Sequence, residues 1–328
     1  MKSTPTTTKY DTAFEEDVAK GLTSFPKYLL SKYIYDEKGD KLFQQIMNMP
    51  EYYLTNCELG IIEQHTASIA DSFNGENGFD LIELGAGDGK KTKVLLKHLV
   101  AKHYDFNYLP VDISQHVLDE LEEALKTEIP GVKIRTQQGT YFKTLEKLAD
   151  YNSRKKVIMV LGSNIGNLLH EKAIDFLKNI CEAMSEEDML FMGFDQKKNP
   201  QQILDAYNDP HGITEAFNKN LLVRMNNELD ADFNIEDFKH WETYNPETGT
   251  ASSYLVSSKQ QQIKIDKLGL TIHFDAWETI HTEISQKYDD HIVQWLAKES
   301  GLAVTDEFSD SENCYKNYIF RRKTFYSY

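Results

Sequence analysis

The chain has 328 residues and a formal net charge of −16, from 36 Lys and Arg against 52 Asp and Glu, and because so acidic a surface repels phosphate backbones we expect no nucleic-acid partner. No apolar run approaches the length of a membrane span, and the N-terminal stretch lacks the apolar core of a secretory signal, so we expect a cytoplasmic protein without membrane contact. The three cysteines lie far apart and the histidines show no metal-ligand spacing, so we predict neither a disulfide framework nor a metal site.

Strand and helix patterns alternate along residues 79–195. Each strand pattern is a short continuous apolar run, such as "FDLIELG", and each helix pattern places apolar residues at helical spacing. This alternation is typical of a parallel sheet that helices cover on both faces. Ser114 is a candidate N-cap for the second helix. We expect strands at residues 79–85, 107–114, 132–139, 156–167 and 188–195, and helices at 90–103, 115–126 and 169–184.

The pattern changes after residue 199. Two helix-like stretches, at 201–209 and 214–229, precede an aromatic patch and a turn, "NPETG", between two strand-like runs. We interpret this segment as an inserted lobe, and we expect the N-terminal residues, rich in Tyr and Phe, to pack with it. The resulting prediction is a lobe of residues 1–56 and 197–285, and a core of residues 57–196 and 286–328.

The end of the chain returns to the sheet pattern. A helix stopped by Gly301 precedes two strand patterns, at residues 302–310 and 314–323. A closing helix and two strands suit a sheet whose last strands pair antiparallel.

The stretch "ELGAGDGKKT" places Gly85, Gly87 and Gly89 between a strand and a helix. Glycines at that point let the backbone approach a ligand closely, and the helix N-terminus offers free N–H groups. A dinucleotide is the default expectation for such a loop. Glu83, however, gives the pattern E-x-G-x-G-x-G, whose carboxylate can receive the ammonium of a methionine moiety. Lys90 and then Lys91 follow Gly89, where dinucleotide folds prefer small residues for close packing.

Asp112 ends the second expected strand, where its carboxylate can accept both ribose hydroxyls of either ligand. Together with Glu83 and the closing helix and strands, it favours S-adenosylmethionine as the ligand. The predicted fold is α/β: the seven-stranded, Rossmann-like sheet of class I methyltransferases with a second, smaller α+β lobe.

Longer stretches carry a more specific match. They are "YDEKGDKLFQQIMNMPEYYLTNCE", "ELGAGDGKKT", "LGSNIGN", "DAYNDPHGITEAFNKNLL…NNELDADF" and "HTEISQKY". In this order they resemble the histidine-specific Nα-methyltransferases of ergothioneine biosynthesis over nearly the whole chain, the inserted lobe included. The resemblance implies transfer of three methyl groups from S-adenosylmethionine to the α-amine of histidine, which forms hercynine.

The resemblance also implies roles for single residues. Tyr52 would border the imidazole, Asn167 and Tyr207 would hold the amino acid end, and Glu283 and Ser285 would hydrogen-bond the imidazole nitrogens. The cofactor positions that it implies are Tyr35, Gly85, Lys91, Asp112, Thr140 and Tyr141. None of these residues is identified as a catalytic acid, base or nucleophile.

Two positions depart from the family pattern. Thr140 stands in place of an acidic residue, and a hydroxyl accepts a weaker hydrogen bond than a carboxylate. Ser253 stands where we expect a larger apolar residue lining the substrate pocket, which leaves the exact substrate open. Read from the local sequence alone, Asn167 could instead be the N-cap of the next helix, Glu283 a solvated charge, and the tyrosines ordinary packing.

We expect a monomeric methyltransferase that acts on a small amino acid, L-histidine by resemblance. Methylation of a different amino acid or amine, or of the histidine ring, is the first alternative. The second alternative is a regulatory module that binds the cofactor without turnover. Mass spectrometry of the product, with fragmentation to locate the methyl groups, distinguishes these possibilities.

Overall fold

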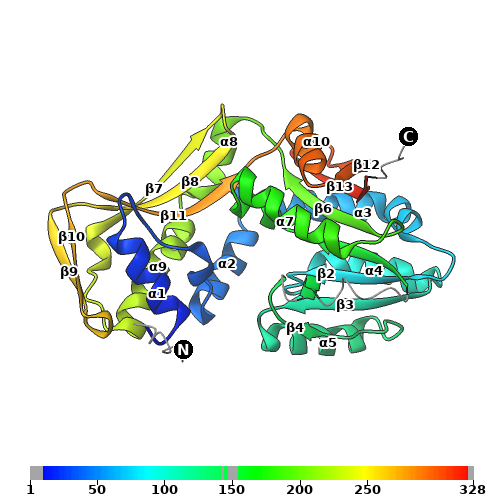
Figure 1. Ribbon diagram of the computed structural model, residues 1–328, viewed down its shortest axis with the longest axis horizontal. Helices are drawn as coiled ribbons and strands as arrows, with labels where there is room; N and C mark the ends of the chain where they lie inside the picture. The colour runs from blue at the N-terminus through cyan, green and yellow to red at the C-terminus, as the bar shows by residue number, and fades with distance from the viewer. Residues whose placement is uncertain (1–9, 142–143, 147–153, 324–328) are drawn as a thin grey trace, which may run out of the picture. The chain divides into compact units, whose positions relative to one another are not determined.

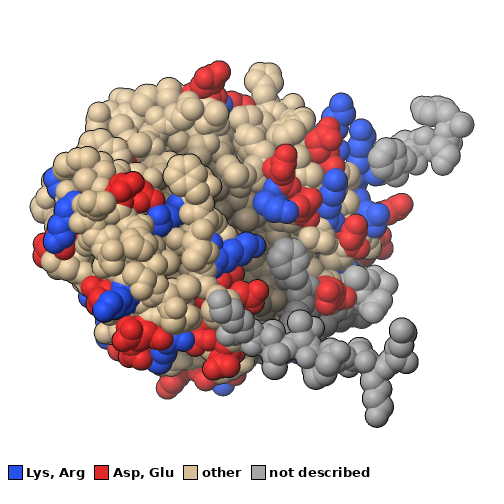
Figure 2. Space-filling model, turned by 60° about the vertical axis from the view of Figure 1, so that its left-hand side comes forward, with Lys and Arg blue, Asp and Glu red and all other residues tan. Residues whose placement is uncertain are grey.

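The computed structural model describes residues 10–141, 144–146 and 154–323. The chain divides into two compact units (Figure 1): residues 1–53 with 198–285, here called the lobe, and residues 54–197 with 286–328, here called the core unit. The boundaries expected from the sequence, after residues 56, 196 and 285, lie close to these. On the face shown in Figure 2, basic and acidic side chains are interspersed between broad uncharged areas.

The core unit contains a sheet with the predicted number of strands and the order β12-β13-β6-β5-β2-β3-β4. Strands β2 to β6 of this sheet run parallel, whereas β13 pairs antiparallel with both β6 and β12. This order and the antiparallel end confirm the predicted class I methyltransferase fold. The strands are β2 (Phe79–Leu84), β3 (Phe106–Asp112), β4 (Gln137–Gln138), β5 (Lys155–Val160), β6 (Met189–Asp195), β12 (Leu302–Ser309) and β13 (Tyr315–Arg322).

The third predicted strand is much shorter than expected. The sequence predicts residues 132–139, but β4 covers only Gln137–Gln138, with one isolated bridge between Ile134 and Tyr108. The stretch is mostly polar and lies at the edge of the sheet, so only one neighbouring strand and a few apolar side chains hold it in register.

Helices cover both faces of the sheet because successive strand residues point to opposite sides. Ile82 and Ile158 pack with helices α7 and α10, whereas Leu81 and Val157 pack with α3, α4 and α5. Ser114 caps α5 as predicted, its Oγ accepting from the N–H of Val117. The helices are α3 (Leu54–Phe73), α4 (Lys90–Ala101), α5 (Gln115–Glu128), α7 (His170–Ala183), α10 (Asp290–Glu299) and the short 3-10 helix η2 (Asn164–Asn167).

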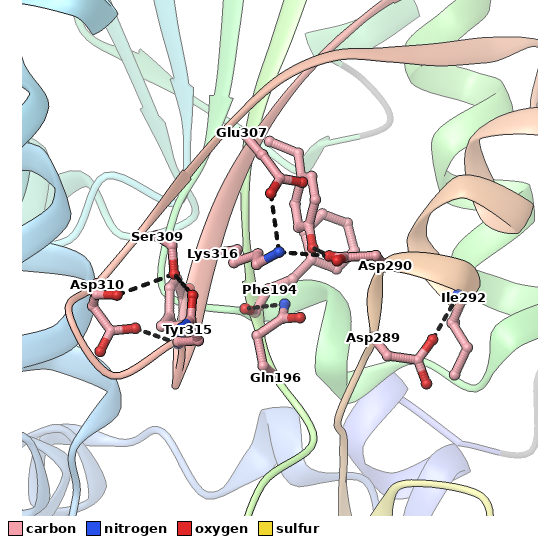
Figure 3. A network of polar contacts seen from close by, with 12 residues as sticks. Phe194, Gln196, Asp289, Asp290, Ile292, Glu307, Ser309, Asp310, Tyr315 and Lys316 are labelled. Carbon is pink, nitrogen blue, oxygen red and sulfur yellow. Dashed lines mark hydrogen bonds and ion pairs between the residues drawn. The ribbon is translucent and has the colours of Figure 1, made fainter.

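A polar network joins the start of α10 to the two C-terminal strands (Figure 3). Lys316 of β13 reaches Asp290 at 2.8 Å and Glu307 of β12 at 3.1 Å. Asp289 caps the helix by accepting from the N–H of Ile292 at 2.9 Å. The network fixes α10, the helix that follows residue 285, onto the antiparallel edge of the sheet.

The lobe is built from the N-terminal segment and the insertion. Its main sheet has the order β1-β11-β8-β7, and β9 and β10 form a separate hairpin. One hydrophobic cluster joins both segments, with Phe14 and Val18 from the first and Phe217, Phe238 and Leu255 from the second. The elements are α1 (Ala13–Thr23), β1 (Lys27–Tyr28), η1 (Ser31–Tyr33), α2 (Glu37–Met47), α8 (Pro200–Tyr207), α9 (Ile213–Leu229), η3 (Ile235–Asp237), β7 (Phe238–Asn245), β8 (Thr250–Ser257), β9 (Gln261–Ile265), η4 (Asp266–Leu268), β10 (Leu270–Phe274) and β11 (Thr279–Gln286).

Candidate active site

The glycine loop of the core unit lies at the carboxyl end of β2, the edge where open α/β sheets bind ligands. Gly85, Gly87 and Gly89 all have positive φ, at 79°, 53° and 64°, which favours glycine at each of them. A Cβ built at Gly87 would meet no atom within 4 Å, so the loop borders open space there. The loop can therefore bring its backbone close to a ligand.

Asp112 holds the glycine loop from the neighbouring strand. Its Oδ2 accepts from the N–H of Gly87 at 3.3 Å, and its Oδ1 accepts from the N–H of Ser114 at 3.0 Å. The hydroxyl of Tyr141 lies 2.3 Å from a Cβ built at Gly85. Burial, and next the charges of Asp112 and Glu83, raise the pKa of Tyr141 to about 12, so its hydroxyl stays protonated. Three of the predicted cofactor positions, Gly85, Asp112 and Tyr141, thus lie together.

The other predicted cofactor positions have different surroundings. Lys91, in the first turn of α4, pairs with Glu58 of α3. Thr140 is exposed beside Tyr141. Tyr35 belongs to the lobe and not to the core unit.

Glu83, which precedes the loop on β2, has hydrogen-bond partners inside the core unit. Its carboxylate is buried, with Oε1 accepting from Thr92 Oγ1 at 2.6 Å and Oε2 accepting from the hydroxyl of Tyr108. Burial raises the pKa of Glu83 to about 7, against the opposite effect of these hydrogen bonds. Because the carboxylate is buried and both of its oxygens have partners inside the core unit, the geometry favours a structural role, which ties α4 and β3 to β2, over a direct contact with a ligand.

Asn167 is exposed in η2, a few residues beyond the carboxyl end of β5. It is not the N-cap of α7, because that helix begins at His170 and its N-cap is Leu169. The segment is held by the N–H of Gly166, which donates to the carbonyl of Ser163 at 2.8 Å. The alternative interpretation of Asn167 as a helix cap is therefore wrong.

Four predicted residues gather in the lobe around Tyr207, which ends α8. The Tyr207 hydroxyl and Ser285 Oγ lie 2.7 Å apart, and the rings of Tyr207 and Tyr52 have centroids 6.2 Å apart. Burial raises the pKa of Tyr35 well above its usual range, and the charge of Glu283 is the next contribution, followed by Tyr52 and Tyr207. Glu283 is half-buried, in contrast to the solvated charge that the local sequence favoured.

Aromatic rings surround Tyr35. Phe43 and Phe217 contact it edge-on, with centroids at 5.5 and 5.4 Å. The structure therefore brings Tyr35 together with residues predicted to bind the substrate. The cluster combines apolar rings with hydroxyls and a carboxylate, a combination that suits an aromatic or heteroaromatic side chain.

Asp209 supports the cluster from the segment that follows Tyr207. Asp209 accepts the backbone N–H groups of His211, Ile213 and Thr214 at the start of α9, and so fixes the chain just after Tyr207. A sequence signal exists for it, because a short acidic side chain ahead of a helix commonly binds the first amide groups.

Ser253 of β8 lies opposite Glu242 of β7, and its Oγ donates to Glu242 Oε2 at 2.6 Å. The Thr282 hydroxyl donates to the Ser253 carbonyl at 2.9 Å. Ser253 is buried, so its small side chain is packed within a polar strand-to-strand contact.

Among the described residues, no group of three or more His, Cys, Asp or Glu side chains could hold a metal ion. In the same part of the chain, no helix is long and apolar enough to cross a membrane.

The sheet order, the glycine loop and Asp112 at its edge define a class I methyltransferase. The model of the histidine-specific, S-adenosylmethionine-dependent methyltransferase family matches residues 14–322. The histidine N-alpha-methyltransferase of Mycobacterium tuberculosis is 32% identical over 301 residues, covering 88% of this chain and 92% of that protein. The chain belongs to this family.

Two other relatives with different names are also similar over most of this chain. Ergothioneine biosynthesis protein 1 of Schizosaccharomyces pombe is 27% identical over 90% of this chain, which corresponds to 39% of that longer protein. The 4-dimethylallyltryptophan N-methyltransferase of Claviceps fusiformis is 26% identical, covering 88% of this chain and 86% of the relative.

Proposed function

We propose that the chain methylates the α-amine of L-histidine with S-adenosylmethionine, in three successive transfers that form hercynine, as a step of ergothioneine biosynthesis. The observation that carries the proposal is the cluster of Tyr52, Tyr207, Ser285 and Glu283 in a chain of this family. It offers an aromatic wall, hydroxyls and a carboxylate to one heteroaromatic side chain.

On the cofactor side, the glycine loop would accommodate the ligand closely and Asp112 would accept the ribose hydroxyls. Tyr141 would contribute its ring near the adenine, and the Lys91 ammonium would attract the carboxylate of the methionine portion. These groups fit the ligand. The loop borders open space at Gly87, and it leads directly into the N-terminus of α4, where backbone N–H groups can bind an anion.

On the substrate side, Glu283 would accept an imidazole N–H and Ser285 would serve the other ring nitrogen. They lie two residues apart on β11, so both side chains point to the same face. Asn167 would contribute a donor and an acceptor to the amino acid end, and Tyr207 a hydroxyl.

The reaction needs little acid or base catalysis from the protein. S-adenosylmethionine supplies a methyl group on a sulfonium, which is already activated. The chain has to hold an uncharged amine in line with that methyl group and keep water away. The tyrosines suit this task, because each combines a hydroxyl that can hydrogen-bond with an apolar ring.

Mass spectrometry of the purified protein with S-adenosylmethionine and each of the twenty amino acids tests the proposal. Histidine should gain three methyl groups, and fragmentation should place all of them on the α-nitrogen. Methyl groups on the imidazole would instead support the ring-methylating alternative. A module without turnover would bind S-adenosylhomocysteine and yield no methylated product.

A second candidate is Nα-methylation of a larger aromatic amino acid. Ser253 is the observation behind it, because a small, buried side chain that bonds Glu242 stands where the family resemblance predicts a larger apolar one. A relative named for 4-dimethylallyltryptophan belongs to the same set of similar proteins. A higher kcat/KM for tryptophan than for histidine would establish this candidate over the first.

A further inference from the structure

The side chain of Glu58 is fully buried in the core unit, at 0% exposure. It lies on the apolar face of α3, in line with Leu54, Ile61 and Ile62, which are all buried. A carboxylate taken out of water is costly unless hydrogen bonds and an opposite charge compensate it. Its partners therefore indicate why an acidic residue is present on this face.

Three donors from distant parts of the chain converge on Glu58. Its Oε2 accepts from the Lys91 ammonium and from the backbone N–H of Gly162 at 2.7 Å. Its Oε1 accepts from the side-chain amide of Asn317 at 2.9 Å. A Cβ built at Gly193 of β6 would lie 2.2 Å from Oε1, so the carboxylate fits directly against that glycine. Both oxygens of Glu58 thus have donors.

These contacts meet where a ligand would bind. Lys91 follows the glycine loop at the end of β2, and Gly162 lies two residues beyond the end of β5. The two strands are parallel neighbours, so their carboxyl ends lie at the same edge of the sheet. The Lys91 ammonium is 3.5 Å from a Cβ built at Gly162, which has a φ of 78°. Glu58 therefore holds the ammonium against this loop.

We propose that Glu58 is a positioning residue for the cofactor, which holds the Lys91 ammonium in the place where it binds the carboxylate of the methionine portion. The role rests on the proposed function, because it takes Lys91 as a cofactor contact. An ammonium has three N–H donors, and the bond to Glu58 leaves others for the ligand. Without this anchor, the Lys91 side chain would sample several rotamers in the free protein. Fixing one of them on binding would then cost entropy and weaken the affinity for the cofactor.

Glu58→Gln tests the role with little change of shape. The amide keeps one acceptor oxygen but directs an NH₂ group toward converging donors. We expect the Kd for S-adenosylhomocysteine, measured by titration calorimetry, to rise roughly tenfold or more. The KM for S-adenosylmethionine should rise with it, while kcat at saturating cofactor changes much less.

Asn317→Ala is the matched control, because it removes the donor on Oε1 and leaves the contacts of Oε2 with Lys91 and Gly162. It should lower the Tm but leave the Kd for S-adenosylhomocysteine within about threefold of wild type, since the ammonium keeps its anchor. A loss of affinity in Asn317→Ala equal to that of Glu58→Gln would show that Glu58 acts only through general stability, and would overturn the proposal.

Lys91→Met completes the test. If Glu58 acts through Lys91, Glu58→Gln should weaken binding by a clearly smaller factor in the Lys91→Met background than in wild type. Equal factors in the two backgrounds, or wild-type affinity in Glu58→Gln, would overturn the role. Should Glu58→Gln fail to fold, Glu58→Asp, which keeps the charge but shortens its reach, enters the same cycle. Wild-type protein that does not bind S-adenosylhomocysteine would contradict the cofactor assignment itself.

Discussion

His240 of β7 fixes the backbone of Tyr207. Its Nε2 lies 2.9 Å from the Tyr207 carbonyl oxygen, which can only accept, so Nε2 carries the proton. Nδ1 then accepts from the side-chain amide of Asn218, also at 2.9 Å. Burial lowers the pKa of His240, and Lys219 acts in the same direction, although the Tyr207 carbonyl and the charges of Glu215 and Asp209 oppose the shift. The imidazole is therefore neutral near pH 7.

The His240 contacts predict a pH-dependent stability. An unfolded histidine takes up a proton as the pH falls below its ordinary pKa of 6.5, whereas folded His240 resists because protonated Nδ1 would face the Asn218 donor. Its contribution is thus complete above that pH and declines below it. At pH 8, His240→Phe should be less stable than wild type by about 1–3 kcal/mol in urea unfolding, and at pH 5.5 the difference should shrink.

His116, which is exposed on α5, provides the control for that experiment. Its replacement by Gln should leave the urea midpoint unchanged at both pH values. A difference between wild type and His240→Phe that stays constant with pH would mean that His240 titrates normally in the folded protein.

Asp112 offers a direct test of the cofactor site. Asp112→Ala should weaken S-adenosylhomocysteine binding by about 1.5–3 kcal/mol, the scale of hydrogen bonds to a charged group. Because Asp112 also accepts from Gly87 and Ser114, Tm is measured alongside the calorimetry. Asp119→Ala, on the exposed face of α5, should leave affinity unchanged. Unaltered affinity in Asp112→Ala would remove the carboxylate from the ribose site.

The elements that the sequence predicts well are those set by local signals. The cap at Ser114 and the end of α10 before Gly301 depend on a few neighbouring residues, and both are found in the structure. The sequence overestimates the length of the edge strand at residues 132–139. Its pairing depends on one neighbouring strand, and its polar side chains contribute little burial.

The candidate site was harder to predict because its contacts are distant in sequence. Glu83 has the spacing of a ligand contact, but its partners Thr92 and Tyr108 lie nine and 25 residues away, and they turn its carboxylate inward. The sequence does single out Glu58, because it is a charged residue on an apolar helix face. Its partners, separated by 33, 104 and 259 residues, could not be inferred from spacing.

The ion pair between Lys287 and Asp195 should dominate the stability at the end of β6. The two charged atoms lie 2.8 Å apart and both side chains are fully buried. Lys287→Met leaves the carboxylate buried without its cation and should cost about 3–5 kcal/mol of unfolding free energy. The double variant Lys287→Met with Asp195→Leu should recover part of that loss.

The exposed pair Lys41–Glu37 is the comparison for this prediction, since water screens it. Lys41→Met should leave the urea midpoint unchanged. A double variant at positions 195 and 287 that is less stable than the sum of its single variants would contradict a compensating role for the pair.

Glu283 should select the side chain of the substrate. Its carboxylate would accept the imidazole N–H, and removing it leaves that donor buried without a partner. Glu283→Ala should therefore raise the activation free energy for histidine by about 1.5–3 kcal/mol, which lowers kcat/KM roughly ten- to 150-fold. Burying a carboxylate against the larger apolar ring of tryptophan is costly, so the weak activity on tryptophan should persist or rise in the variant. The measurement is kcat/KM for both amino acids in wild type and variant.

Glu278, immediately before β11, is the matched control, because it pairs with Lys27 and lies five residues earlier in the same part of the lobe. Glu278→Ala should lower stability and leave the ratio of the two kcat/KM values unchanged, since this carboxylate already has a cation. Equal losses for histidine and tryptophan in Glu283→Ala would assign Glu283 to the fold of the lobe. No loss for either would mean that the half-buried carboxylate near Tyr35 does not contact the substrate, and the imidazole would then have to be recognised by the hydroxyls of Tyr207 and Ser285.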